Sequence, residues 1–166
     1  GDVTISLPPS DSSALITGSD CTITFWHMRR SSFTNYSNFI FYYNTFPTSS
    51  IPEGQWVYRF TTLALSETFE VYINGSNVKS GQYQFLEDTW YFHTIVLGGG
   101  EWSWYRNLDL LIDISWLSSS NLDLTTESLQ FGQAGAYGRY GDIRIHNKVL
   151  SQAEREAIFS LGRQSY

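Results

Sequence analysis

The chain is poor in cysteine, in lysine and in charge of either sign. Its 166 residues include one cysteine, Cys21, and two lysines, Lys79 and Lys148. A single cysteine forms neither an internal disulfide nor a cysteine cluster for zinc, so a small disulfide- or zinc-stapled scaffold is excluded. Charged residues make up 16% of the chain and leave a net charge of −6. Because nucleic-acid-binding domains are usually basic, a nucleic-acid partner is not expected.

Long apolar runs are also lacking, and a membrane span requires about 18 or more consecutive apolar residues. Membrane insertion is therefore not expected. The length suits one domain, 1–166, with 1–20 as a first strand and lead-in. Because the chain begins with Gly1, we expect it to be part of a larger multidomain or multimeric assembly.

Aromatic residues, in contrast, are abundant. Trp, Tyr and Phe make up 17% of the chain, with 6, 11 and 11 copies respectively. Disordered chains are poor in aromatic residues and rich in charge, so this composition indicates a globular domain. The aromatic side chains must either fill a core or contact a ligand, and their positions along the chain decide between the two.

Alternation with a period of two dominates the sequence. In 21–28 both alternating sets contain large apolar residues, which predicts a strand packed on both faces. Asn74-Gly75 follows another alternating run, and this dipeptide indicates a hairpin because both residues tolerate positive φ. Further strands are expected at 39–43, 56–60, 69–73, 90–97, 108–116, 128–131 and 142–146.

One segment near the C-terminus has helical features. Ser151 is a good N-cap and Glu154 lies three residues later, which together form a capping box. Gly162 suits the end of the helix. Strands that recur about every ten residues favour a sandwich or jelly roll. The apolar face of the helix is expected to consist of Ala153, Ala157, Ile158 and Leu161.

Four segments resemble laminin-G-like and concanavalin A-like jelly-roll domains. They are the first core strand, a middle strand with Trp followed by His, a short later strand, and a closing strand that runs into an acidic helix: 22–26, 90–95, 129–132 and 141–154. The resemblance implies an all-β fold, namely a two-sheet antiparallel jelly-roll sandwich with one short C-terminal helix. The chain departs from the family after the middle strand, where three glycines, 98–100, precede the insertion-like segment 102–106.

That insertion-like segment is the first candidate binding site. Trp102 and Trp104 are two residues apart and face the same way in an extended chain, beside Tyr105 and Arg106. Aromatic faces stack on the apolar faces of sugars, and Arg supplies donors in a fixed geometry. Packing of these tryptophans into the edge of the sandwich is the alternative.

Two further groups join the candidate site. Asp109 and Asp113 are predicted to share one strand face, where carboxylates accept hydrogen bonds from sugar hydroxyls, although an ordinary solvated face is the favoured reading. Tyr137, Arg139 and Tyr140 form a second aromatic and basic group in a glycine-rich stretch that is expected to be a loop. A solvated turn is the equal alternative there.

The sequence does not carry a recognisable catalytic site. Glycoside hydrolysis needs two carboxyls about 5 to 9.5 Å apart, whereas residues four apart on a strand are about 13 Å apart. Glycoside hydrolases of this superfold carry Glu-x-Asp-x-Glu or Glu-x-Asp-x-x-Glu on one strand, and this chain has neither. The protein is therefore expected not to be an enzyme.

No cofactor is expected either. The three histidines, His27, His93 and His146, lack ligand-like spacing and are interpreted as structural. Some laminin-G-like and pentraxin-like domains bind Ca²⁺, and Asp142 matches the aspartate of the closing motif. Calcium takes six to eight oxygen ligands, and the sequence does not assemble such a set, so no metal-ligating residue is assigned.

These observations favour a non-catalytic carbohydrate-binding module for a cell-surface or cell-wall saccharide, acting in host or surface adhesion. The composition is similar to that of modules on phage tail and baseplate proteins, which implies an extracellular or virion-surface location. The alternative is a structural or protein–protein interaction domain of the same fold, with its exposed aromatics as interface anchors.

Overall fold

A computed structural model describes eleven segments of the backbone, and side chains in part of them. The backbone is described at 5–7, 20–29, 37–43, 56–63, 66–73, 76–82, 86, 88–98, 101–115, 129–131 and 138–165, and the side chains at 20–28, 86, 88–96, 98, 103–113 and 139–165. Within these segments, none of the helices is both long and apolar enough to cross a membrane.

Eleven strands and one helix make up the described structure. In chain order they are β1 (Ile5–Leu7), β2 (Cys21–Arg29), β3 (Ser37–Tyr43), β4 (Trp56–Leu63), β5 (Ser66–Ile73), β6 (Ser76–Gln82), β7 (Trp90–Gly98), β8 (Glu101–Arg106), β9 (Asp109–Ser115), β10 (Leu129–Phe131), β11 (Gly138–His146) and α2 (Gln152–Gly162).

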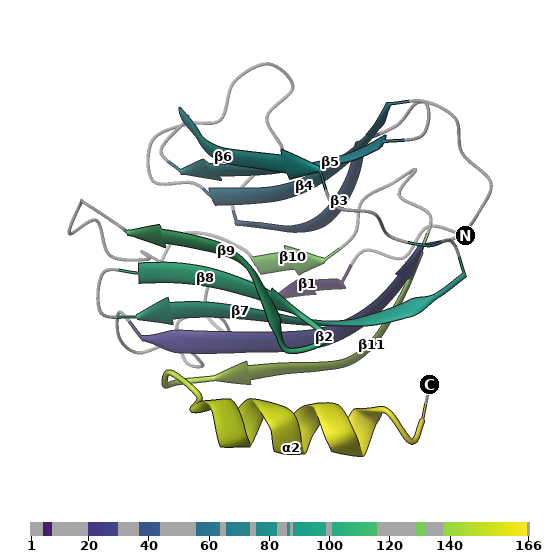
Figure 1. The fold of residues 1–166 in the computed structure, drawn as a ribbon, viewed down its shortest axis with the longest axis vertical. Coiled ribbons are helices and arrows are strands. Elements are labelled where there is room, and N and C mark those ends of the chain that lie inside the picture. Colours follow the sequence, from purple (N-terminus) through teal and green to yellow (C-terminus); the bar gives the residue numbers. More distant parts are fainter. Residues whose placement is uncertain are drawn as a thin grey trace.

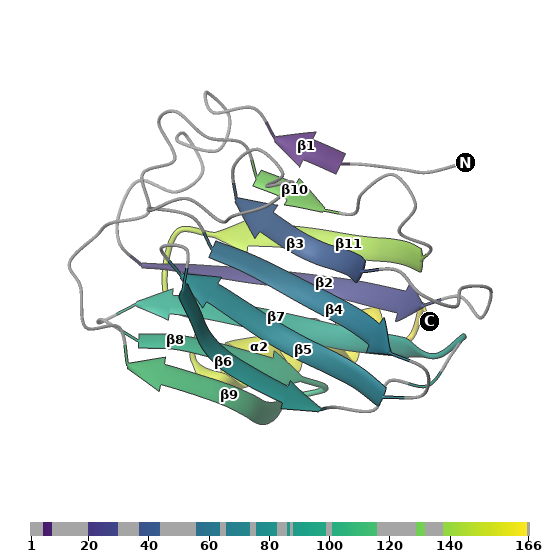
Figure 2. The same ribbon diagram turned by 90° about the horizontal axis from the view of Figure 1, so that it is seen from above.

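The strands form two antiparallel sheets that stack on each other (Figures 1 and 2). One sheet has six strands in the order β1-β10-β3-β4-β5-β6, and the other has five in the order β11-β2-β7-β8-β9. Figure 1 shows α2 on the outer face of the five-stranded sheet, away from the six-stranded one. The expected fold class, an all-β jelly-roll sandwich with one C-terminal helix, is confirmed.

The two central strands of the five-stranded sheet, β2 and β7, are buried on both faces. Trp26 and Phe92 point to the helix and pack with Leu150 and Ile158. Because side chains alternate along a strand, the neighbouring Phe25 and its partner in β7 face the six-stranded sheet instead. Every residue of 21–28 is buried, which confirms the prediction of a strand packed on both sides.

Two regions differ from the sequence-based expectation. Residues 102–106, expected to be an insertion with a loop-like course, belong to strand β8, which pairs with both β7 and β9. Residues 138–140, expected to belong to a loop, begin strand β11. The local sequence pattern did not predict these strands, because each depends on pairing with another strand. β8 pairs with the edge of β7, and β11 pairs with β2, which is distant in the sequence.

The helix begins as expected. The Ser151 hydroxyl accepts a hydrogen bond from the Glu154 amide, and the Glu154 carboxylate accepts one from the Ser151 amide at 2.8 Å. The hydrogen bond to Lys148, followed by those to Ser151, lowers the pKa of Glu154 to about 2. Thr22 of β2 then fixes this end of the helix to the sheet, because its hydroxyl donates to the Lys148 carbonyl and accepts from the Leu150 amide.

The buried face of the helix only partly matches the prediction. Ile158 is buried as predicted, but Ala153, Ala157 and Leu161 are exposed, and Gly162 is buried in their place. Gly162 ends the helix but has a different role from the expected one, since a Cβ there would lie 2.2 Å from Nε1 of Trp26. The helix is rotated so that its smallest residue lies against the Trp26 indole, which also stacks on Phe159 at 5.6 Å.

This rotation makes a testable prediction about stability. Ile158→Ala is expected to lower the free energy of unfolding by about 2 to 4 kcal/mol, because it leaves a cavity against the sheet. Leu161→Ala is expected to change it by less than about 0.5 kcal/mol, because the Leu161 side chain is in water. Chemical denaturation of both variants measures the difference. Equal losses, or a larger loss for Leu161→Ala, would show that the helix packs through the face that the sequence suggested.

Candidate functional site

A row of aromatic rings crosses the five-stranded sheet on the face toward the other sheet. His93 of β7 stacks between Phe25 of β2, at 4.9 Å between ring centroids, and Trp104 of β8, at 5.7 Å. Tyr140 of β11 continues the row at 6.2 Å from Phe25. Four strands thus contribute one ring each, and the two interplanar angles of 6° at His93 show parallel stacking.

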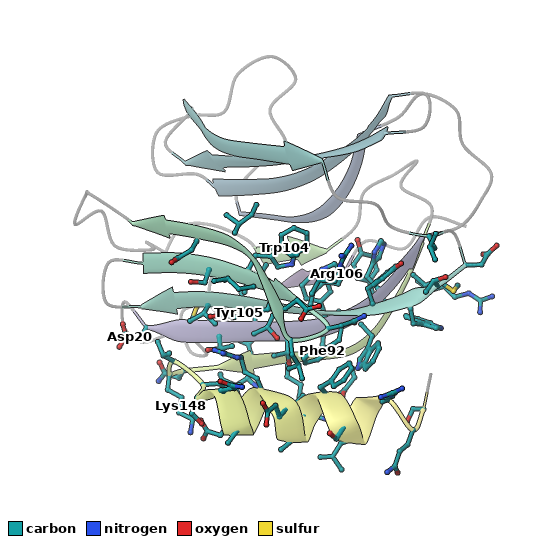
Figure 3. All side chains as sticks on the ribbon, in the orientation of Figure 1. Asp20, Phe92, Trp104, Tyr105, Arg106 and Lys148 are labelled. Carbon is teal, nitrogen blue, oxygen red and sulfur yellow. The ribbon has the colours of Figure 1, made fainter. Side chains whose placement is uncertain are left out.

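Trp104, proposed from the sequence as a sugar-stacking residue, is part of this core. Its side chain is 0% exposed, and its indole Nε1–H donates to Nδ1 of His93 at 3.1 Å. Figure 3 shows Trp104 directed into the space between the sheets. A ring that is buried on both sides has no face for a ligand, so the prediction for Trp104 is wrong. The cause is its position in β8, opposite Ile95 and Ile112, where the sandwich core requires a large apolar side chain.

The Trp104 hydrogen bond also fixes the state of His93. An indole nitrogen only donates, so Nδ1 of His93 must accept, and the neutral imidazole carries its proton on Nε2. Burial lowers the pKa of His93 well below its usual value, and the charges of His27 and Arg106 lower it further. His93 is therefore neutral at pH 7, as the structural interpretation of this histidine requires.

Polar residues replace the apolar core toward one end of the same face. Tyr140, His27 and Tyr91 lie side by side on β11, β2 and β7, because His27 pairs with both tyrosines. Arg106 pairs with His93, and its guanidinium carbon lies 5.5 Å from the centroid of the Tyr91 ring. We call these five residues, His27, Tyr91, His93, Arg106 and Tyr140, the end cluster.

The end cluster forms because four strand ends meet at one end of the sandwich. β2 and β8 end there and β7 and β11 begin there, as their antiparallel pairing requires. The turn from β8 to β9 has positive φ at Asn107 (48°) and Leu108 (78°), the geometry of a two-residue hairpin turn. The Asn107 side chain accepts a hydrogen bond from the Phe92 amide at 2.9 Å, which ties the turn to β7. Arg106, the last residue of β8, therefore directly precedes a short turn that is hydrogen-bonded to β7.

The members of the end cluster differ in exposure. His27 and His93 are buried, whereas Tyr91, Arg106 and Tyr140 are partly exposed. The Tyr91 hydroxyl accepts a hydrogen bond from the Leu86 amide at 3.0 Å. The Tyr140 ring lies 4.9 Å from that of His27. Two partly exposed aromatic rings and a guanidinium therefore stand on a rigid, buried base, which is the arrangement of aromatic walls and few polar anchors that suits small polar ligands.

Asp109 and Asp113, predicted to share a strand face, lie on opposite faces of β9. Asp109 pairs with Arg106, whereas Asp113 pairs with Ser103 and accepts a hydrogen bond from its hydroxyl at 3.1 Å. Ser103 and Arg106 are three apart in a regularly paired strand and so face opposite sides. A bulge in β9 after Leu110 adds one unpaired residue, and this extra residue moves Asp113 to the face opposite to Asp109. Both carboxylates are exposed, and only Asp109 is near the end cluster.

Tyr105 is separated from the end cluster in the same way. It lies on the helix side of β8, where the guanidinium carbon of Arg155 is 4.1 Å from the centroid of its ring. Tyr105 and Arg106 were expected to act together, but alternation along β8 sends them to opposite faces of the sheet. Tyr105 therefore helps to fix α2 to the sheet.

The remaining predicted residues have mixed outcomes. Arg139 is exposed at the same end of the sheet as Arg106, but it pairs with Met28 and therefore lies on the face of β11 opposite to Tyr140. Trp102 lies in β8 opposite Leu97, toward the other end, and its side chain is outside the described residues. Tyr137 also lies outside the described residues. The structure thus brings Arg106, Asp109 and Tyr140 together on one face at this end of the sheet, and it places Arg139 on the opposite face.

Sequence reasoning missed His27 and Tyr91 as members of the site. Each lies inside an apolar strand pattern; His27 was interpreted as structural, and Tyr91 was not singled out. One signal was available: both are polar aromatics at the ends of strands whose centres are apolar, since β2 ends and β7 begins beside them. Only the pairing of His27 with Tyr91 and Tyr140, however, shows that they meet.

Asp142, which the family resemblance connects with calcium, is held by Arg144. The guanidinium donates to both carboxylate oxygens at 2.8 Å, and this pairing raises the pKa of Arg144. Asp142 itself has φ of 45° in the bulge of β11. Across the side chains that the structure describes, no three His, Cys, Asp or Glu residues converge to a metal-ligating group.

The sequence matches no family model and no curated protein, whereas its fold resembles that of known structures. A botulinum neurotoxin serotype D binding domain is similar at a TM-score of 0.62 and 15% identity over 89% of this chain and 38% of that one. The serotype D ligand binding domain in complex with N-acetylneuraminic acid gives 0.58 and 18% over 86% and 36%. A native heptameric SAP-like pentraxin from Limulus polyphemus gives 0.56 and 12% over 86% and 70%.

These similarities establish the fold. At such low identity they carry no residue-level assignment, and the chain spans about two fifths of the length of the toxin domains. All three structures share the jelly-roll sandwich with the present chain. They confirm the jelly-roll fold that the resemblance implied, and they do not extend to its laminin-G or phage-tail part.

His93 yields a prediction on pH dependence. Its folded pKa lies below its unfolded value, so the unfolded state binds the proton more readily, and stability is full above about pH 6.5 and falls as the pH drops toward 5. His93→Gln keeps an acceptor for Trp104 and is expected to reduce this slope, by up to about 1.4 kcal/mol per pH unit. Urea denaturation between pH 5 and 7.5 measures it.

His146→Gln is the control for this experiment, because the pKa of His146 is also lowered, chiefly by partial burial. It should remove a smaller part of the slope. An unchanged slope in His93→Gln would show that His93 is not buried in its neutral form.

Proposed function

We propose that this domain binds a saccharide non-catalytically at the end cluster. The observation that carries the proposal is the position of Tyr91, Arg106 and Tyr140, which are partly exposed at one end of the five-stranded sheet above the buried His27 and His93. The tyrosine rings offer flat apolar faces, and the guanidinium and phenol groups offer hydrogen bonds at their edges. A sugar ring presents the same combination of an apolar face and polar edges.

Rigidity of the base supports the proposal. Tyr140 rests on the buried rings of His27 and Phe25, and Arg106 contacts the Tyr91 ring beside the β8–β9 turn. Little conformational entropy is therefore lost when a ligand is bound, which favours affinity for a small polar molecule. The structural likeness to a toxin domain solved with N-acetylneuraminic acid is consistent with a saccharide as the ligand class.

The proposal extends to the biological setting. The domain serves as a binding module of a larger protein, outside the cell or on a virion surface, where it attaches to a cell-surface or cell-wall saccharide. Repeated copies would raise a weak single-site affinity through multivalency. This setting rests on the composition of the chain and on its resemblance to lectin-like jelly rolls.

A glycan array followed by calorimetric titration tests the site with matched variants. Tyr140→Ala is expected to weaken binding of the best glycan by about ten-fold, equivalent to about 1.4 kcal/mol. Tyr105→Ala should leave the Kd within about two-fold, because this partly exposed tyrosine lies on the helix face. Thermal unfolding of both variants verifies that they fold.

Three other outcomes would count against the proposal. Loss of binding in Tyr105→Ala with normal binding in Tyr140→Ala would place the site on the other face of the sheet. If none of the glycans on the array binds, the saccharide function is wrong. If a copurified protein partner binds the wild type but not Tyr140→Ala, the end cluster is a protein interface instead.

A further inference from the structure

Arg106 is the member of the end cluster that stays charged at every physiological pH, and its charge acts on the buried part of the cluster. Its guanidinium lies over the face of Tyr91, and its backbone lies opposite His93. The pKa of His93 is lowered first by burial and then by the charges of His27 and Arg106. Because water is largely excluded around His93, the field of Arg106 is weakly screened there.

The nearby carboxylates are placed differently. Asp109 pairs with Arg106 across β8 and β9, and Asp88 precedes β7 at the same end, but both are exposed. Exposed charges are screened by water and salt within about 10 Å. Among the charged side chains that the structure describes at this end of the sheet, the partly buried Arg106 therefore contributes most to the potential inside the end cluster.

We infer that the saccharide bound at the end cluster carries an anionic group, a carboxylate or a sulfate, which Arg106 binds. This inference rests on the proposed saccharide function. A guanidinium holds its N–H donors in one plane, in a fork that matches two oxygens of an anion. Contact with the Tyr91 ring fixes the position of that fork at the partly exposed edge of the cluster.

Matched pairs of saccharides that differ in charge test the inference. Suitable probes are 3′-sialyllactose against lactose, sulfated against unsulfated N-acetyllactosamine, and oligogalacturonate against its methyl ester. In at least one pair the acidic member is expected to bind about ten-fold or more tightly than the neutral one. Its affinity should fall as sodium chloride is raised, since salt screens the attraction.

Two pairs of variants assign the preference to Arg106. Arg106→Gln is expected to abolish the difference between acidic and neutral members, whereas Arg155→Gln, the same charge change on the helix side of the sheet, should preserve it. Asp109→Asn keeps a hydrogen-bonding side chain and removes a nearby negative charge, so it should tighten binding of the acidic member about two- to three-fold. Asp113→Asn, on the opposite face of β9, should have no such effect.

The outcomes separate the inference from the function on which it rests. Equal binding of acidic and neutral members, or a preference for neutral ones, overturns the anionic inference and leaves saccharide binding intact. A preference for acidic members that persists in Arg106→Gln also overturns it, because the anion is then held elsewhere. Binding of no probe of either kind overturns the proposed function itself.

Discussion

Burial of β2 and β7 on both faces is the constraint on which the rest of the structure depends. Alternate side chains of these strands point to opposite faces. Trp26 and Phe92 pack against α2, whereas Phe25 and His93 face the second sheet. A strand buried on both sides can lie only at the centre of a sheet, between two covering layers. β11 and β8 therefore flank β2 and β7 within the sheet, and α2 covers the outer face of the sheet.

The candidate site lies at the end of β2 and β7 where the two strands are no longer fully buried on both faces. Along the face toward the six-stranded sheet, the apolar centre gives way to His27, Tyr91 and Arg106 as the strands reach one end. Their bases remain packed while their polar groups approach water. His93 lies at the boundary between the apolar core and the polar end cluster. It accepts a hydrogen bond from the Trp104 indole on the core side, and it pairs with Arg106 on the cluster side.

Local features of the fold could be predicted where short-range physics decides them. The capping box at Ser151 was correct because both of its hydrogen bonds connect residues three apart. The strands on either side of Asn74-Gly75 pair as the hairpin prediction requires, since Ile73 lies opposite Ser76, whereas the two turn residues themselves lie outside the described residues. The packing face of α2 was not predictable from apolar spacing. It depends on the close approach of Gly162 to Trp26, which lies more than a hundred residues earlier in the chain.

The sequence by itself determined the fold class, the central strands, the helix start and the residue types at the site: aromatic rings, arginines and few other charges. Only the tertiary structure decided which of them act together. Alternation along β8 divides Tyr105 from Arg106, a bulge in β9 divides Asp109 from Asp113, and the core takes Trp104. The physical reason is that a strand assigns its side chains to faces through its pairing partners and bulges, and these are properties of the sheet rather than of any single segment.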